Sequence, residues 1–180
     1  MTINNLIEIL KEDKPSIKLK EHEEELFGLI PEFKKCKGFN QNNPWHPYDV
    51  YEHILHVVDN VDNNIILRLT ALFHDIGKPE VYKEDEQGIG HFYNHWTISK
   101  EIFERYDFEN KELISKLIYY HDKKITPEEE ELFTKEELIL LYEIKKADLL
   151  AQSKEYHYLI EDLDKKINEL RSDINDMSKM

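Results

Sequence analysis

The segment from Ile65 to Ile76 (IILRLTALFHDI) is apolar on nearly all of its faces. A helix without a polar face is stable only where other elements cover it on every side. We therefore expect this segment to form the centre of a helical bundle. It stops at Gly77, which we expect to adopt a left-handed cap conformation, and Pro79 follows directly beyond.

Most of the remaining chain also predicts helices. Five glycines and six prolines divide it into segments, most of which carry helical periodicity. No Asn-Gly or Asp-Gly turn joins two alternating apolar runs, so we expect at most one extended piece, near residues 81–91. The predicted fold class is all-α: a compact bundle of about seven helices plus a C-terminal amphipathic helix. The expected helices span residues 3–11, 20–34, 48–62, 63–76, 95–106, 111–120 and 135–152, with an eighth over 154–177.

The C-terminal segment carries a regular apolar seam. Its apolar residues recur at alternating spacings of four and three, which is typical of a helix that packs against another helix. The seam consists of Tyr156, Ile160, Leu163, Ile167, Leu170, Ile174 and Met177. Two interpretations remain open: the helix packs back on its own domain, or it forms a coiled coil in a homodimer. We divide the chain into an N-terminal lead-in (1–20), a main domain (21–153) and this C-terminal helix (154–180).

Charge and cysteine content exclude several classes of protein. With 24 Lys+Arg against 38 Asp+Glu, the net charge of −14 opposes non-specific binding to nucleic acids or anionic membranes. The single cysteine excludes an intramolecular disulfide. The first residues do not resemble a secretory signal, and no apolar run approaches the roughly 20 residues that span a bilayer. We expect a cytoplasmic protein without a membrane segment.

Histidines and aspartates interrupt the apolar faces of the predicted helices. One such residue alone is usually a hydrogen-bonded core histidine or a paired carboxylate. Asp75, at the end of the most buried segment, needs a cationic partner. Together the inward residues form a nitrogen and oxygen ligand set suited to a divalent metal, with no thiolate for a structural zinc site. The set consists of His53, His74, Asp75, His95, His121 and Asp148.

The order His53, then HDIGKP at 74–79, then Asp148 resembles the HD superfamily of metal-dependent phosphohydrolases. The stretches LFGLIPEFKKCKGFNQNNPWHPYDVYEHIL (26–55) and GHFYNHWTISKEI (90–102) are similar to the HD domain in the C-terminal half of bacterial CCA-adding tRNA nucleotidyltransferases. The resemblance covers about residues 21–153 and implies an HD-domain helical bundle. The polymerase head of those enzymes, with its Gly-Ser and paired-carboxylate motif, is absent from these 180 residues. CCA addition by this polypeptide alone is therefore not implied, and a separate nucleotidyltransferase subunit as partner is an open question.

The resemblance also implies a ligand set. By resemblance, His53, His74, Asp75 and Asp148 hold the first metal ion. In relatives with two ions, histidines from the next two helices complete a second site that shares the aspartate of the HD pair, and His95 and His121 stand where these are expected. His91 is the rival of His95, which we prefer because Asn94-His95 occupies the place of the family's Gly-His. The cofactor is one or two divalent ions, of Mn, Fe, Ni, Co, Mg or Zn.

The implied chemistry is phosphoester hydrolysis. Asp75 and Asp122 are the candidate catalytic carboxylates, the latter accepting a proton or orienting His121. Lys78 would pair with a substrate phosphate or with an acidic neighbour, and Lys123 would contact substrate or lie in a solvated loop. We predict an enzyme: a phosphomonoesterase or phosphodiesterase acting on nucleotides or on terminal RNA phosphates such as a 2′,3′-cyclic phosphate. The alternatives are a metal-binding regulatory or interaction module without turnover, and a di-iron oxygenase.

Overall fold

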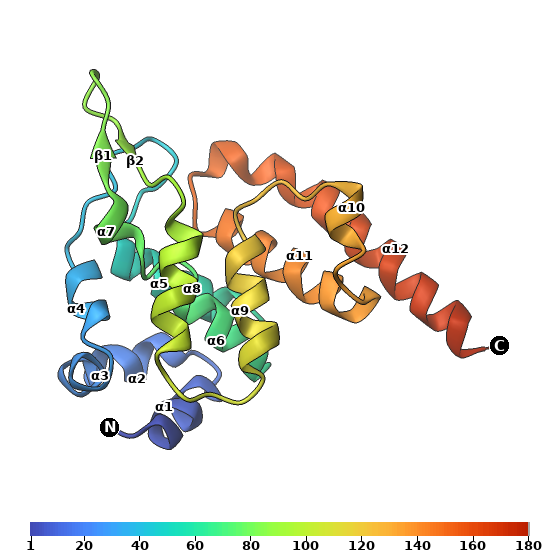
Figure 1. Ribbon diagram of the computed structural model, residues 1–180, viewed down its shortest axis with the longest axis horizontal. Helices are drawn as coiled ribbons and strands as arrows, with labels where there is room; N and C mark the ends of the chain where they lie inside the picture. Colours follow the sequence, from blue (N-terminus) through green and yellow to red (C-terminus); the bar gives the residue numbers. More distant parts are fainter. Residues whose placement is uncertain (180) are drawn as a thin grey trace.

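A computed structural model describes residues 1–179 of the chain (Figure 1). The fold is all-α, as predicted, with one minimal two-stranded sheet. The elements are α1 (Ile3–Leu10), α2 (Pro15–Glu21), α3 (Glu23–Leu29), α4 (Glu32–Cys36), α5 (Val50–Asn60), α6 (Ile65–Phe73), α7 (Lys78–Val81), β1 (Lys83–Glu84), β2 (Gly90–His91), α8 (His95–Glu104), α9 (Lys111–Tyr120), α10 (Pro127–Glu130), α11 (Lys135–Leu150), the 3-10 helix η1 (Lys154–Leu159) and α12 (Ile160–Ser178).

Helix α6 is the centre of the bundle, which confirms the prediction for this segment. Every residue from Leu67 to Phe73 is buried, and α1, α5, α8, α9 and α11 pack around the helix (Figure 1). Even Arg68 is only 3% exposed. Its guanidinium donates to the carbonyl oxygens of Leu10 and Glu12, at 2.7 and 2.8 Å, and so ties the end of α1 to α6. A buried cation is tolerated here because backbone acceptors replace its water.

The prediction of one helix over residues 20–34 is wrong. The structure divides this region into α2, α3 and α4. His22 leaves helical geometry at φ −112° and ψ 27°, which separates α2 from α3. Pro31 has no N–H to continue α3 and instead precedes α4. The helix predicted at 48–62 begins at Val50, where the side chain of Asp49 caps the N–H of Glu52.

The turn after α6 also differs from the prediction. Helix α6 ends at Phe73, so the His74-Asp75 pair lies in a turn rather than in the helix. Gly77 has φ −82° and is not a left-handed cap. A Cβ at this position would lie 2.6 Å from the backbone nitrogen of Ser99 and 2.8 Å from the Cβ of Ile98. The chain requires glycine here because the turn packs directly against α8, not because of its backbone dihedrals.

The predicted extended piece is present as a hairpin whose two strands have two residues each, with Lys83 paired to His91 and Glu84 to Gly90.

At the C-terminus, α12 runs along α11, so the helix packs on its own chain (Figure 1). Ile167 is buried, and Leu163 and Leu170 pack against the core. Residues 154–159, the start of the predicted seam, form a 3-10 turn instead. Pairing of α12 with a second copy stays a prediction.

None of the helices within residues 1–179 combines the length and the apolar character that a membrane-crossing helix needs.

Gly77→Ala is expected to lower the free energy of unfolding by about 2 kcal/mol or more, because its Cβ would collide with backbone that cannot move aside. The matched control is Gly28→Ala, on the exposed side of α3, where a Cβ meets no atom within 4 Å. That change is expected to raise stability by about 0.5–1 kcal/mol through helix propensity. Urea denaturation of both variants checks the pair, and equal stabilities would contradict the close packing of the turn.

Candidate metal centre

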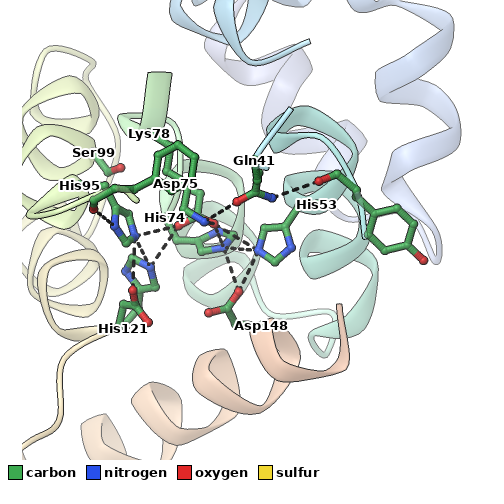
Figure 2. Close-up of polar contacts among 12 residues, drawn as sticks. Gln41, His53, His74, Asp75, Lys78, His95, Ser99, His121 and Asp148 are labelled. Carbon is green, nitrogen blue, oxygen red and sulfur yellow. Dashed lines mark hydrogen bonds and ion pairs between the residues drawn. The ribbon is translucent and has the colours of Figure 1, made fainter. Parts of the chain in front are cut away.

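Six buried side chains from five places in the chain converge on one point of the bundle (Figure 2). His53 comes from α5, His74 and Asp75 follow α6, His95 begins α8, His121 follows α9, and Asp148 comes from the last turns of α11. All six are less than 10% exposed. They form two groups within metal-ligating distance: His53, His74, Asp75 and Asp148 in the first, and Asp75, His95 and His121 in the second.

Asp75 belongs to both groups through its two carboxylate oxygens. Oδ2 lies 3.1 Å from His53 Nε2 and 3.3 Å from His74 Nε2. Oδ1 lies 3.0 Å from His95 Nε2 and 3.3 Å from His121 Nε2. The carboxylate therefore bridges the two groups, one oxygen to each. Asp148 completes the first group with Oδ1 2.8 Å from His53 Nε2.

The helix ends orient the imidazole rings. His74 and His121 are the C-caps of α6 and α9, where the last carbonyls have no partner within the helix. Each ring turns back, and its Nδ1–H donates to the carbonyl three residues earlier, at 2.5 Å to Ala71 and 2.6 Å to Ile118. The Nδ1–H of His95 donates to Phe92 at 3.0 Å in the same way. Because a carbonyl can only accept, each bond fixes the tautomer and leaves the Nε2 lone pair facing the centre.

This donor set fits a cation and little else. The Nε2 atoms of His95 and His121 lie 3.3 Å apart, and the lone pairs of both face Asp75 Oδ1 without a proton donor between them. Acceptors this close repel one another unless a metal ion or a proton lies among them. Nitrogen and oxygen ligands without a thiolate suit the divalent ions of the first transition row or Mg. The residues therefore fit the predicted metal cofactor.

The charges within the two groups favour protonation of His74. Burial alone would lower the pKa of His74, but the carboxylates of Asp75 and Asp148 raise it to about 10. Burial would raise the pKa of Asp75, yet the charges of His74 and Lys78 hold it well below its usual range. The pKa of Asp148 is likewise held down, against burial, by His53 and His74. A metal ion bound to His74 Nε2 would displace this proton.

Lys78 lies beside Asp75 and is 4% exposed. Its ammonium donates to Asp75 Oδ2 at 3.0 Å and to Gln41 Oε1 at 2.8 Å, and it stands 5.1 Å from the centre of the Phe92 ring (Figure 2). Of the two roles considered for Lys78, the structure places it in contact with the acidic neighbour. The cationic partner expected for Asp75 is thus present, and the ammonium is committed to protein groups.

The other sequence candidates lie at the rim. Asp122 has a half-exposed side chain whose Oδ2 is 3.8 Å from His95 Nε2. It does not orient His121, because the backbone of Ile118 does so. Lys123 stacks its ammonium on the Tyr119 ring at 4.4 Å. His91, the rival of His95, bonds to Asp85 on the hairpin at 2.8 Å and lies outside both groups.

Sequence reasoning missed three residues around the site. Gln41 is fully buried and holds Lys78, while its amide donates to Tyr48 O at 3.2 Å. His46 packs edge-on against His53, with ring centres 5.1 Å apart. Lys145, on α11, donates to the carbonyls of His121 and Lys123 at 3.1 and 2.7 Å. None of the three carries a local sequence signal, because a loop glutamine, a loop histidine and a helix lysine are usually solvated.

Residues 45–153 match the family described as the HD domain. The chain belongs to the HD domain family. This stretch contains all six converging residues, and the family consists in general of metal-dependent phosphohydrolases.

Two relatives extend the comparison. Over 88 residues, 43% of this chain, the sequence is 30% identical to the A-adding tRNA nucleotidyltransferase of Deinococcus radiodurans, of which this match covers 20%. Over 98 residues, 51% of this chain, it is 37% identical to an uncharacterized protein of Clostridium beijerinckii, of which it covers 60%. The match therefore spans about a fifth of the length of the first relative and somewhat more than half of the length of the second. The first match establishes distant homology to the HD region of a tRNA nucleotidyltransferase.

Metal affinity is expected to fall as the pH is lowered from 8 to 6. His74 has a pKa of about 10 in the metal-free protein and stays protonated throughout this range, so every binding event releases at least that proton. The expected loss is about tenfold in affinity per pH unit for each proton released. Calorimetric titration of chelator-treated protein with Mn²⁺, in two buffers of different ionisation enthalpy, measures both the affinity and the number of protons released. An affinity independent of pH would show that the centre binds without proton exchange.

Proposed function

We propose that this protein is a metal-dependent phosphohydrolase that cleaves phosphate esters of nucleotides or terminal phosphates of RNA. The observation that carries the proposal is the bridging Asp75 carboxylate between two groups of buried histidines. Family membership supports it, since HD domains are in general phosphohydrolases. The relative from Deinococcus radiodurans acts, by its name, on tRNA, which favours RNA ends and 2′,3′-cyclic phosphates as members of the substrate panel.

The reaction we propose is addition of water to the phosphate ester. One P–O bond forms to the oxygen of water, the P–O bond to the ester oxygen breaks, and a proton from water passes to the leaving alcohol. Divalent ions in such centres polarise phosphoryl oxygens and supply a water-derived nucleophile near neutral pH. The six buried residues would hold the ions, and the Nδ1–H bonds of His74, His95 and His121 to backbone carbonyls orient the Nε2 atoms of these rings toward them.

Asp122 is the carboxylate that we propose for proton transfer. Its Oδ2 is 3.8 Å from His95 Nε2, and its side chain is 51% exposed, so it faces both the centre and solvent. Asp75 and Asp148 are occupied by histidines within the groups and are poorly placed to exchange protons with water. Asp75 therefore binds and orients the ligand groups, and Asp122 carries out the proton transfer.

Phosphate release from 2′,3′-cyclic, 2′-, 3′- and 5′-nucleotides is the test. Chelator-treated protein resupplied with Mn²⁺, Co²⁺, Ni²⁺ or Mg²⁺ should regain activity, and Asp148→Asn should lower kcat/KM by about a hundredfold or more. Asp148→Asn is preferred to a change at Asp75, whose loss would also leave Lys78 buried without its partner. Asp85→Asn, on the hairpin, is the matched control and should retain activity. Metal uptake without turnover of any ester would contradict the proposal and favour a regulatory module or an oxygenase.

We further propose that two ions bind per chain, one in each group. His95→Ala is expected to lower the metal content from two ions to one, because it removes a ligand from the second group only. His91→Ala is the control, since this neighbouring histidine bonds to Asp85 instead. Metal content after gel filtration, measured by mass spectrometry, decides the number. A single ion in the wild-type protein, or an equal loss in both variants, would refute the two-ion centre.

A further inference from the structure

The metal centre opens into a cavity of about 320 Å³ on one side of the bundle. His121 and Asp148, one ligand from each group, both line it, so it reaches both halves of the centre. The other walls come from the loop after α9, from α11, and from η1 and α12. The C-terminal helix thus forms a wall of the space through which a substrate would reach the ions.

Four lysines surround this cavity. They are Lys123, Lys124, Lys145 and Lys166. Among residues 1–179, no carboxylate lies within 4.0 Å of any of these four ammonium groups. In a chain of net charge −14, unpaired cations gathered at the mouth of one cavity offset the local field. Asp122, Asp148 and Asp162 also line the cavity, so its lining holds four lysines and three carboxylates, and Asp148 is already bonded to His53.

The backbone holds one of these lysines in place. Lys145 Nζ donates to the carbonyls of His121 and Lys123, which uses two of its three N–H bonds. Lys166 lines the cavity from α12, and its ammonium is 5.5 Å from the centre of the ring of Tyr142 on α11. Leu149, Leu159 and Leu163 supply apolar surface between the charged groups. The cavity is therefore built for a small molecule with anionic groups and an apolar body.

We propose that this cavity binds a substrate that carries a second phosphate in addition to the one cleaved, and that Lys166 of α12 contacts that second phosphate. This inference rests on the proposed hydrolase function and adds the substrate class. The volume admits a mononucleotide or the end of a short oligonucleotide rather than a duplex. Two sources share the chemistry: a second phosphate on one nucleoside, or the preceding phosphodiester at an RNA end. A lysine pairs with either as a point charge.

The test compares three substrates that share the same 3′-phosphate. Adenosine 3′-phosphate has no second phosphate, adenosine 3′,5′-bisphosphate carries it on the same nucleoside, and the 3′-phosphorylated dinucleotide of adenosine carries it as a phosphodiester. For each substrate with a second phosphate, kcat/KM is divided by the kcat/KM of adenosine 3′-phosphate. In Lys166→Ala, at least one of these two ratios should fall about tenfold, as expected for one lost charge-assisted hydrogen bond. The substrate whose ratio falls identifies the source of the second phosphate.

Lys165→Ala is the matched control. It removes the same charge from the neighbouring position of α12, where the lysine is exposed and does not line the cavity. The substrate ratios should then equal those of the wild type. Ratios unchanged in Lys166→Ala, or lowered equally in both variants, would overturn the inference while leaving the hydrolase proposal intact.

A second measurement separates failure of the inference from failure of the proposed function. Calorimetric binding of adenosine 3′,5′-bisphosphate to the Mn²⁺-loaded Asp122→Asn protein, with and without Lys166→Ala, needs no turnover and keeps all six ligand residues. A tenfold weaker binding on loss of Lys166 supports the site even if no ester is hydrolysed. Equal affinity, or no binding to either protein, overturns it.

Discussion

The shared carboxylate of Asp75 is the constraint on which the site depends. A carboxylate that is 2% exposed has no water to stabilise its charge, so its neighbours must supply that stabilisation. Lys78 and four imidazoles do so, and each of its oxygens serves a different group of ligands. The elements that carry these neighbours must meet at one point, which fixes how α5, α7, α8 and α9 surround the end of α6.

Helix ends decide the chemistry of the ligands. A histidine in the middle of a helix would find the nearby carbonyls already bonded. His74 and His121 instead cap α6 and α9, where free carbonyls accept the Nδ1–H and turn Nε2 inward. Helix α6 ends at Phe73, three residues earlier than the periodicity suggests, and this early end allows His74 to take up its orientation in the site. The close approach of Gly77 to Ser99 keeps the turn against α8, which brings His95 to Asp75.

Helix α11 joins the metal centre to the cavity. Lys145 and Asp148 lie three residues apart on one face of the helix and line the cavity, and Gln152, just beyond the end of the helix, lines it too. Asp148 turns toward the histidines, while Lys145 fastens the loop after α9 to the same helix. On the neighbouring helix, Ile167 packs inward and Lys166 faces the cavity. Packing of the apolar seam therefore holds α12 in place and also directs Lys166 into the cavity.

The sequence by itself determined the fold class, the central helix and the residues that converge. These follow from short-range rules: an all-apolar helix must be covered, and inward histidines and aspartates must find partners. The tertiary structure alone decided three further points. It committed Lys78 to Asp75 and Gln41, it excluded His91 from the two groups, and it placed Lys145 and Lys166 at the cavity. The positions of Lys78 and Lys145 depend on contacts between residues far apart in the chain, Lys78 with Gln41 and Lys145 with His121, and no local pattern encodes such a contact. The division of residues 15–36 into three helices has a local cause at Pro31, whereas the break at His22 has no such signal in the sequence.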